Sequence, residues 1–356
     1  MSNLAFDLYT DDGIQAAASA LTAGEVIAIP TDTVPGLAVS ATAAAGSKKL
    51  ADLKGNNHAK PFSWHIAQLK TLQALSPNLP AGIHPWLIEK LQQKCTVLLP
   101  SKFFALPSAA DWQFDKLGLR WPQNIDFQRL CQNLDSPLLA TSINDSTSPP
   151  IFGDDLVSWL EQRNVPYALQ ILDCPPHSPA STIIDVYPHP KLLRGELVDF
   201  DEIGLSILVV CSGNTCRSPL AAALLEAEIA SSWQVSPEQL RNFGFDIQSA
   251  GTFAIDGQSI SENSLAVAAE NGIDLSSHQA QSLASANEHT WDIVLGMSHN
   301  HLNAIPPEIP AALFDHSSGE IADPFGGDID CYRATYNQLQ TAAQQWVKEL
   351  SAWPQR

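Results

Sequence analysis

One ten-residue string combines a thiol nucleophile with an anion clamp. It reads Val210-Cys211-Ser212-Gly213-Asn214-Thr215-Cys216-Arg217-Ser218-Pro219 and lies between an apolar run and an Ala/Leu-rich run. A loop that joins a strand to a helix start directs several backbone N–H groups at one point, where the helix dipole adds positive potential. These groups should stabilise a thiolate at Cys211, while Arg217 can grip phosphate oxygens with two N–H groups. The string therefore predicts a cysteine that attacks phosphorus, with Ser218 hydrogen-bonded to its sulfur.

The leaving group of such a reaction needs a proton, and Asp323 is the candidate acid. It opens the string Asp323-Pro324-Phe325-Gly326-Gly327, in which proline stiffens the loop and the glycines permit a tight turn. We expect a thiophosphate intermediate that water then hydrolyses, with Asp323 donating a proton first and accepting one afterwards. The alternative is that Cys211 is only a buried thiol, which is the better interpretation of a lone cysteine. The surrounding loop, Arg217 and the Asp-Pro pair together argue against it.

The string CSGNTCRSP, the later Ser249-Ala250-Gly251 and the Asp-Pro loop together resemble the low-molecular-weight protein-tyrosine-phosphatase family over residues 205–356. The resemblance implies a doubly wound parallel sheet, phosphorylated protein substrates and no cofactor. It also implies a phosphate loop and its support, made of Ser212, Gly213, Asn214, Thr215, Cys216, Ser218, Ser249 and His278. Asn214, Ser249 and His278 would hold the loop in shape by hydrogen bonds. Cys216 would trap an oxidised Cys211 as a reversible disulfide.

Two positions bear on the substrate, Thr215 and Phe325, which would line the leaving-group pocket. Tyrosine-directed members carry a bulky aliphatic residue at the first position and paired aromatic residues after the Asp-Pro. Thr215 and Phe325-Gly326-Gly327 instead resemble the bacterial protein-arginine-phosphatase branch, since a hydroxyl can contact the guanidinium group of phosphoarginine. Phosphotyrosine and phosphoarginine both stay open. Arsenate reductases share this fold but need further redox cysteines, in a segment where this chain has none.

The N-terminal half carries a second ordered set of polar residues. Pro30-Thr31-Asp32-Thr33-Val34-Pro35-Gly36-Leu37 follows an apolar run, and blocks rich in Lys, Arg, Ser and Asn come later. Grouped together, these cations and hydroxyls would form a compact pocket for a triphosphate and a carboxylate. The structural alternative is that the lysines are solvated and that the threonines cap a turn.

In this order the blocks resemble the YrdC-like threonylcarbamoyl-adenylate synthase family over residues 8–198. The resemblance implies a twisted α/β sheet and the condensation of ATP, accompanied by Mg, with L-threonine and bicarbonate. The product would pass to transferase proteins of the pathway that makes the t6A base of tRNA. The residues that it places in the substrate pocket are Thr31, Thr33, Lys54, Lys60, Arg120, Ser142, Asn144, Ser181 and Arg194.

Four departures from that family bear on the activity of the N-terminal half. Pro35 replaces a tyrosine, Asn56 replaces an arginine, and Gln93-Lys94-Cys95 replaces a Pro-Gly-Pro. The spacing from Arg194 to the following glycine is also shortened. Each lost charge-assisted hydrogen bond costs about 1.5–3 kcal/mol. The alternative to a bifunctional enzyme is therefore a phosphatase whose N-terminal half is a non-catalytic nucleotide-binding or regulatory module.

The helices and strands that must position these residues are predicted from hydrophobic periodicity and from helix-cap and turn residues. We expect helices over 14–21, over 219–229 with Ser218 as N-cap, and over 332–350, together with strands over 25–29, 96–99, 138–141, 182–186 and 207–210. Alternating strands and helices predict two α/β domains, with a parallel sheet in the second. The acidic segment 195–204 lacks periodicity and separates the domains, which we place at 8–198 and 205–356.

Composition excludes several classes of protein. A net charge of −19 argues against broad nucleic-acid binding, which needs a Lys/Arg surface. Six cysteines without a CxxC pair or a His/Cys cluster predict no protein-ligated metal. Apolar runs stay short of the ~20 residues that span a bilayer, and Met1-Ser-Asn-Leu-Ala-Phe-Asp does not read as a signal peptide. A cytoplasmic protein that does not bind membranes is expected.

Overall fold

The computed structural model describes residues 5–43, 45–55, 61–108, 113–144, 148–187, 190–196, 198, 200, 203–286 and 288–352. The chain divides into two compact units. Unit 1 comprises Met1–Leu79 and Pro85–Val198, and unit 2 comprises Pro80–His84 and Asp199–Arg356. The domain limits predicted from the sequence, 8–198 and 205–356, stay a prediction.

Unit 1 is built on a mixed sheet. Its described strands are β1 (Ala5–Phe6), β2 (Ile27–Ile29), β3 (Gly36–Ser40), β4 (Ser63–His65), β5 (Cys95–Pro100), β6 (Lys116–Arg120), β7 (Leu138–Ser142), β8 (Tyr167–Ala168), β9 (Thr182–Asp185) and β10 (Lys191–Arg194). Their order is β1-β8-β2-β3-β7-β4-β6-β5-β9-β10. The pairs β2–β3, β3–β7 and β5–β6 are antiparallel, whereas β4–β6 and β5–β9 are parallel. The predicted strand over 25–29 is shorter, because only its last three residues pair.

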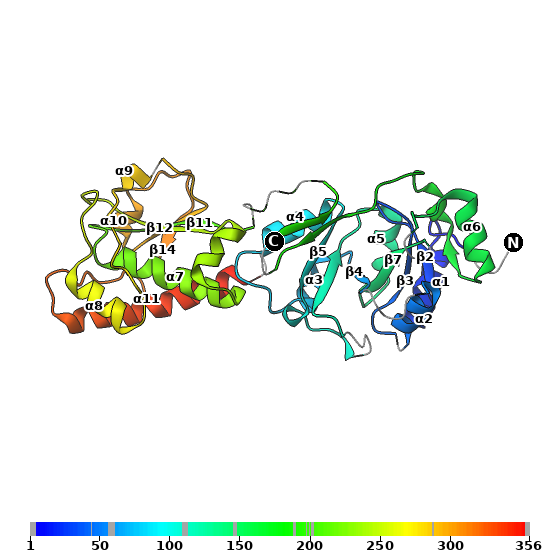
Figure 1. The fold of residues 1–356 in the computed structure, drawn as a ribbon, viewed down its shortest axis with the longest axis horizontal. Helices are drawn as coiled ribbons and strands as arrows, with labels where there is room; N and C mark the ends of the chain where they lie inside the picture. The colour runs from blue at the N-terminus through cyan, green and yellow to red at the C-terminus, as the bar shows by residue number, and fades with distance from the viewer. Residues whose placement is uncertain are drawn as a thin grey trace. The chain divides into compact units, whose positions relative to one another are not determined.

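Helices cover this sheet. They are α1 (Asp11–Thr22), α2 (Gly46–Leu53), α3 (Leu69–Leu75), α4 (His84–Gln92), α5 (Ile125–Cys131) and α6 (Gly153–Gln162), with 3-10 turns η1 (Ser101–Phe103) and η3 (Leu169–Asp173). Helix α1 starts earlier than the predicted 14–21, since Thr10 accepts a hydrogen bond from Gly13 N and caps it. Its buried face packs on β2 and β3, and α2 packs on β3 (Figure 1).

Unit 2 has the predicted parallel sheet. Its described strands are β11 (Ser206–Cys211), β12 (Asp246–Gly251), β13 (Ile293–Gly296) and β14 (Ala311–Leu313), in the order β12-β11-β13-β14 and all parallel. The helices are α7 (Arg217–Trp233), α8 (Glu262–Glu270), α9 (Leu283–Ala286), α10 (His299–Leu302) and α11 (Ile329–Leu350), with the 3-10 turn η4 (Pro237–Phe243). Helix α7 packs on β11 and β12 and runs beside α11 (Figure 1). The α/β class predicted for both halves is confirmed.

The start of α7 corrects one prediction. The helix begins at Arg217, with Cys216 as N-cap, so that Ser218 lies inside the first turn and does not cap it. The physical reason is that the Ser218 hydroxyl donates to the sulfur of Cys211, while its oxygen accepts from the side-chain amide of Asn214 and not from a backbone N–H of the helix. The predicted closing helix is present and begins three residues before Tyr332.

Tryptophan packing completes unit 2 at the end of α7. Trp233 is fully buried, and its ring lies 4.5 Å from that of Phe243 and 5.7 Å from that of Phe245, centroid to centroid. Its indole Nε1 donates to the carbonyl of Ala81 at 2.8 Å, so the short segment Pro80–His84 belongs to this core. Among the helices that the structure describes, none is long and apolar enough to cross a membrane.

Candidate functional site

The nucleophile predicted in unit 2 lies at the junction of β11 and α7. Cys211 is the last residue of β11 and is 2% exposed. Its Sγ accepts a hydrogen bond from Asn214 N at 3.3 Å and another from the Ser218 hydroxyl at 3.1 Å. A sulfur that receives two donors beside a helix N-terminus is placed to carry negative charge.

Asn214 holds the loop closed over that sulfur. Its φ of 52° lies in the left-handed region, which asparagine tolerates better than most residues. The buried side-chain amide donates to Ser218 Oγ at 2.9 Å and to Ser249 Oγ at 2.8 Å, while its carbonyl oxygen accepts from Gln281 N at 2.7 Å. His278 Nε2 lies 2.8 Å from the backbone oxygen of Asn214. The structure thus brings together Asn214, Ser249 and His278, which the family resemblance placed in this support, and adds Ser218 to them.

The end of β12 presses against the same loop. A Cβ on Gly251 would lie 2.5 Å from the carbonyl oxygen of Ser212, so only glycine fits there. The next residues continue the contact, since Thr252 N donates to the oxygen of Cys211 at 2.9 Å and Phe253 N to that of Ser212 at 2.8 Å. These bonds occupy the carbonyl oxygens of Cys211 and Ser212, while the N–H of Asn214 donates to the Cys211 sulfur.

Arg217 supplies the positive charge. The side chain is buried, and one terminal nitrogen donates to the carbonyl oxygen of Ile321 at 3.0 Å. The other terminal nitrogen forms an ion pair with Asp323, whose side chain is 45% exposed. The structure therefore places the predicted clamp and the predicted acid in direct contact, although 106 positions separate them in the chain.

A cleft of about 280 Å³ opens over the sulfur. It is lined by Cys211, Ser212, Gly213, Thr215, Cys216, Arg217, Phe253, Gln258, Asp323 and Phe325. Thr215 is buried in its wall, whereas Phe253 and Phe325 stand at the rim with 86% and 77% of their surface exposed. Both positions predicted for the leaving-group pocket therefore face this cleft.

Cys216 also lines the cleft and contacts its own set of hydroxyls. Its Sγ lies 3.4 Å from Ser261 Oγ and 3.7 Å from the hydroxyl of Tyr332. Burial raises the pKa of that tyrosine, and Cys216 adds to the effect. All six cysteines are free thiols in the structure. The reversible disulfide between Cys211 and Cys216 stays a prediction.

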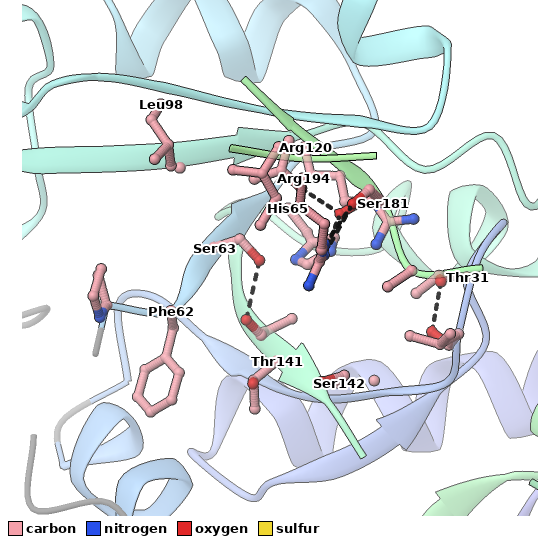
Figure 2. Close-up of a pocket in the computed structure, with 18 of the residues that line it drawn as sticks. Thr31, Phe62, Ser63, His65, Leu98, Arg120, Thr141, Ser142, Ser181 and Arg194 are labelled. Carbon is pink, nitrogen blue, oxygen red and sulfur yellow. Dashed lines mark hydrogen bonds between the residues drawn. The ribbon is translucent and has the colours of Figure 1, made fainter. Parts of the chain in front are cut away.

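Unit 1 contains a polar pocket of about 360 Å³ (Figure 2). Five of the nine residues predicted for the substrate pocket line it, namely Thr31, Arg120, Ser142, Ser181 and Arg194. Figure 2 shows Arg120, Arg194 and Ser181 gathered at one side, with Ser142 across the hollow. Two segments far apart in the sequence meet here, because β9 pairs with β5 and brings Ser181 to 2.9 Å from Thr96.

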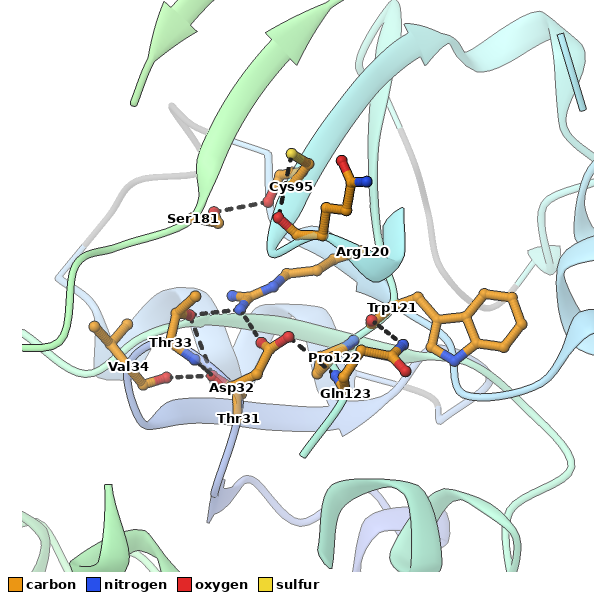
Figure 3. A network of polar contacts seen from close by, with 12 residues as sticks. Thr31, Asp32, Thr33, Val34, Cys95, Arg120, Trp121, Pro122, Gln123 and Ser181 are labelled. Carbon is orange, nitrogen blue, oxygen red and sulfur yellow. Dashed lines mark hydrogen bonds and ion pairs between the residues drawn. The ribbon is translucent and has the colours of Figure 1, made fainter. Parts of the chain in front are cut away.

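The cations of this pocket are engaged by protein groups. Arg120 forms an ion pair with Asp32 and donates to the hydroxyl of Thr33 (Figure 3). Burial lowers the pKa of Arg120, and the charge of Asp32 opposes this effect. Arg194 donates to the backbone oxygen of Ser181 at 2.9 Å.

The remaining predicted residues lie around this pocket or outside the described chain. Lys54 Nζ donates to the backbone oxygen of Ser142 at 3.0 Å and to the side-chain oxygen of Asn144 at 2.6 Å. These two residues therefore support the pocket next to Ser142 but are not among its lining residues. Lys60 and Asn56 lie outside the residues that the structure describes.

Comparison with known proteins assigns both units. The low molecular weight phosphotyrosine protein phosphatase model matches residues 206–355, and the Sua5/YciO/YrdC model, described as "Telomere recombination", matches residues 19–195. Curated relatives match the first of these regions over nearly their whole length. The chain belongs to the low molecular weight phosphotyrosine protein phosphatase family. Unit 1 is a Sua5/YrdC domain, so the family resemblance predicted for each half is confirmed.

Two relatives of the phosphatase unit are named for different substrates. The probable low molecular weight protein-tyrosine-phosphatase AmsI of Erwinia amylovora is 38% identical over 41% of this chain and 97% of its own. The protein-arginine-phosphatase of Geobacillus stearothermophilus is 36% identical over 40% of this chain and 95% of its own. The crystal structure of the Erwinia amylovora phosphatase AmsI is 36% identical, covers 42% of this chain and 95% of its own, and has a TM-score of 0.35.

Sequence reasoning missed several residues at both sites. In the phosphatase unit, Phe253 and Gln258 line the cleft, and His301 lies behind it; no local pattern distinguishes them. In the Sua5/YrdC unit, Ser63 and His65 line the pocket. These two belong to the string Lys60-Pro61-Phe62-Ser63-Trp64-His65, whose period-two alternation places both on the same face of β4.

Proposed function

We propose that unit 2 is a cysteine-dependent protein phosphatase with Cys211 as its nucleophile. The observation that carries this proposal is the position of the Cys211 sulfur. It lies at the floor of a cleft, receives two hydrogen bonds, and has Arg217 in the adjoining wall. Cys216 lines the same cleft, but its sulfur contacts the hydroxyls of Ser261 and Tyr332. Burial raises the pKa values of the thiols of Cys95, Cys131 and Cys174.

The reaction follows from the contacts of the loop. The thiolate of Cys211 attacks phosphorus, an S–P bond forms, and the bond from phosphorus to the leaving oxygen or nitrogen breaks. Arg217 and the loop N–H groups stabilise the charge on the equatorial oxygens. Asp323 gives its proton to the leaving group. Water then attacks phosphorus, Asp323 takes the proton, the S–P bond breaks, and inorganic phosphate leaves.

The ion pair between Arg217 and Asp323 sets the order of these events. A bound phosphoryl group needs hydrogen bonds from the Arg217 guanidinium. One terminal nitrogen of that group now donates to the carboxylate of Asp323. Because nearly half of the Asp323 side chain is exposed, it can turn toward water without leaving a buried charge. Substrate binding therefore exchanges one anion for another at Arg217 and releases the Asp323 carboxylate, which takes up a proton from solvent before it protonates the leaving group.

Thr215 supports phosphoarginine as the preferred substrate. Its side chain lines the cleft above Cys211, where its hydroxyl can accept a hydrogen bond from a guanidinium N–H. The alternative is phosphotyrosine, whose ring would pack on Phe253 and Phe325 at the rim. The named relatives include phosphatases of both kinds, so sequence similarity does not choose between them.

The test is turnover of phosphotyrosine and phosphoarginine peptides by the purified full chain. Cys211→Ser should abolish phosphate release from both peptides. A Cys211→Ser variant with wild-type turnover would show that the thiol is not the nucleophile. The ratio of kcat/KM for the two peptides identifies the preferred substrate.

Unit 1 suggests a second activity, the synthesis of threonylcarbamoyl-adenylate from ATP, L-threonine and bicarbonate. The pocket that Arg120 and Arg194 share with Ser142 and Ser181 offers cations and hydroxyls to a triphosphate and an amino acid. Among the described residues, no group of three His, Cys, Asp or Glu could hold a metal ion. Mg would accompany the phosphates of ATP, as the family resemblance implies. The product would pass to t6A-pathway transferase proteins.

Pyrophosphate release by the full chain, with each substrate omitted in turn, tests this second activity. Release that requires all three substrates would establish a bifunctional enzyme. Without such release, in a preparation whose phosphatase is active, unit 1 would be a non-catalytic nucleotide-binding or regulatory module.

A further inference from the structure

His301 is a buried histidine that the proposed reaction does not use. It lies on the short helix α10 and is 5% exposed. Its ring faces a second cleft of about 590 Å³, which shares Ser212, Arg217, Phe253 and Asp323 with the cleft over Cys211. The histidine is therefore behind the wall that carries the phosphate clamp.

Both ring nitrogens of His301 have hydroxyl partners. Nδ1 lies 2.8 Å from Ser298 Oγ, and Nε2 lies 3.0 Å from Ser212 Oγ. The Ser212 hydroxyl in turn receives a long hydrogen bond of 3.5 Å from Arg217. These contacts form a continuous chain from α10 and its N-cap residue Ser298 to the guanidinium group.

Arg217 can only donate, so the oxygen of Ser212 accepts from it. A neutral His301 suits this chain when the Ser212 hydroxyl donates to Nε2 of its ring. Nε2 is then unprotonated, and Nδ1–H donates to Ser298. This pattern requires a neutral imidazole. Burial, with the positive charge of Arg217, lowers the pKa of His301, while Asp323 and Glu320 oppose the shift.

We propose that His301 is a positioning residue of the phosphatase, which orients the Ser212 hydroxyl and through it the Arg217 guanidinium. The inference rests on the proposed phosphatase function. Without the imidazole, the Ser212 hydroxyl is free to rotate toward Cys211 or into the phosphate site. Arg217 would then lose a hydrogen bond that fixes the plane of its guanidinium group. Bidentate contacts depend on that plane, most of all when charge spreads over the equatorial oxygens in the transition state.

Two amide substitutions separate positioning from packing. The glutamine amide can occupy the place of Nε2 and keep the bond to Ser212, whereas the asparagine amide can replace only Nδ1. We expect kcat to fall about tenfold in His301→Asn and to stay within about threefold of wild type in His301→Gln. KM should change by less than about twofold in both variants. His299→Asn is the matched control, because His299 lies exposed on the same helix.

A double-mutant cycle completes the test. Ser212→Ala removes the hydroxyl that links His301 to Arg217, so adding His301→Asn to it should cause no further loss in kcat. Equal kcat in the two His301 variants, or additive losses in the cycle, would overturn the inference. A wild-type chain without Cys211-dependent turnover would instead overturn the proposed function, and this inference with it.

Discussion

Each unit buries an arginine against an aspartate, and the two pairs differ in the surroundings of the aspartate. In unit 1, the side chains of Arg120 and Asp32 are 7% and 8% exposed. In unit 2, Arg217 is 6% exposed but Asp323 is 45% exposed. The first aspartate also accepts from Gln123 N at 3.0 Å, which fixes it further.

The difference determines which arginine can change partners. Removing one member of a buried ion pair leaves an uncompensated charge and costs about 3–5 kcal/mol. An incoming phosphate that displaced Asp32 from Arg120 would incur that cost, whereas Asp323 can move into water. The exposed Asp323 is what the proposed role of Arg217 as a phosphate clamp requires, whereas Arg120 binds Asp32 and Thr33 within the PTDTV turn. A ligand in unit 1 would add to this pair and not replace it.

The largest effect is expected from Arg217→Lys. An ammonium group cannot form the two parallel bonds of the guanidinium fork, so kcat/KM for phosphate release should fall about 10³-fold. Arg333→Lys is the matched control, since Arg333 pairs with Glu270 on the surface of the same unit. Steady-state kinetics of both variants measure this fall in kcat/KM. A decrease of only a fewfold in the kcat/KM of Arg217→Lys would exclude bidentate phosphate binding by Arg217.

Replacing each aspartate by asparagine should have a different main effect, on stability in unit 1 and on kcat in unit 2. Asp32→Asn leaves Arg120 without a carboxylate and should destabilise unit 1 by about 3 kcal/mol. Asp323→Asn should change stability by less than about 1 kcal/mol, because its pair is half exposed, but lower kcat about 10²-fold. Hydrogen exchange read separately in each unit measures the stability terms. Equal destabilisation by both variants would remove the basis of the comparison.

Acid should weaken unit 1 through His65, which lines the same pocket as Arg120. Burial, with the charge of Arg120, lowers the pKa of His65 to about 3. The unfolded chain takes up this proton near pH 6.5, so stability is lost as the pH falls below 6.5, by about 2 kcal/mol at pH 5. His65→Leu should flatten the pH dependence of hydrogen exchange in unit 1, and His299→Gln should not. An unchanged slope in His65→Leu would contradict this account.

The smallest predicted effect is a change in substrate preference. Thr215→Ile replaces the hydroxyl in the wall of the cleft by an aliphatic surface. The ratio of kcat/KM for phosphoarginine to that for aryl phosphate should fall about tenfold. Thr341→Ile, on the exposed face of α11, serves as the control. If the ratio stays constant in Thr215→Ile, Thr215 does not select the substrate.

Local patterns predicted what depends on neighbours in the sequence. The strand that ends at Cys211, the loop after it and the closing helix follow from short apolar and turn signals. The pairing of Arg217 with Asp323 and of Arg120 with Asp32 depends on chain crossings over roughly a hundred residues, which no local pattern encodes. Ser298-His299-Asn300-His301 shows the limit most simply. Its two histidines are equivalent in the sequence, and only the packing of α10 buries one and exposes the other.

Direct detection of the phosphorylated enzyme tests the central claim most closely. In Asp323→Asn, p-nitrophenyl phosphate should still phosphorylate the thiol, because its leaving group needs little protonation, while hydrolysis should be slow. Rapid quenching and peptide mass spectrometry should then find one phosphoryl group on Cys211, and none after Cys211→Ala. A phosphoryl group on another residue, or equal labelling of the Cys211→Ala variant, would contradict the account.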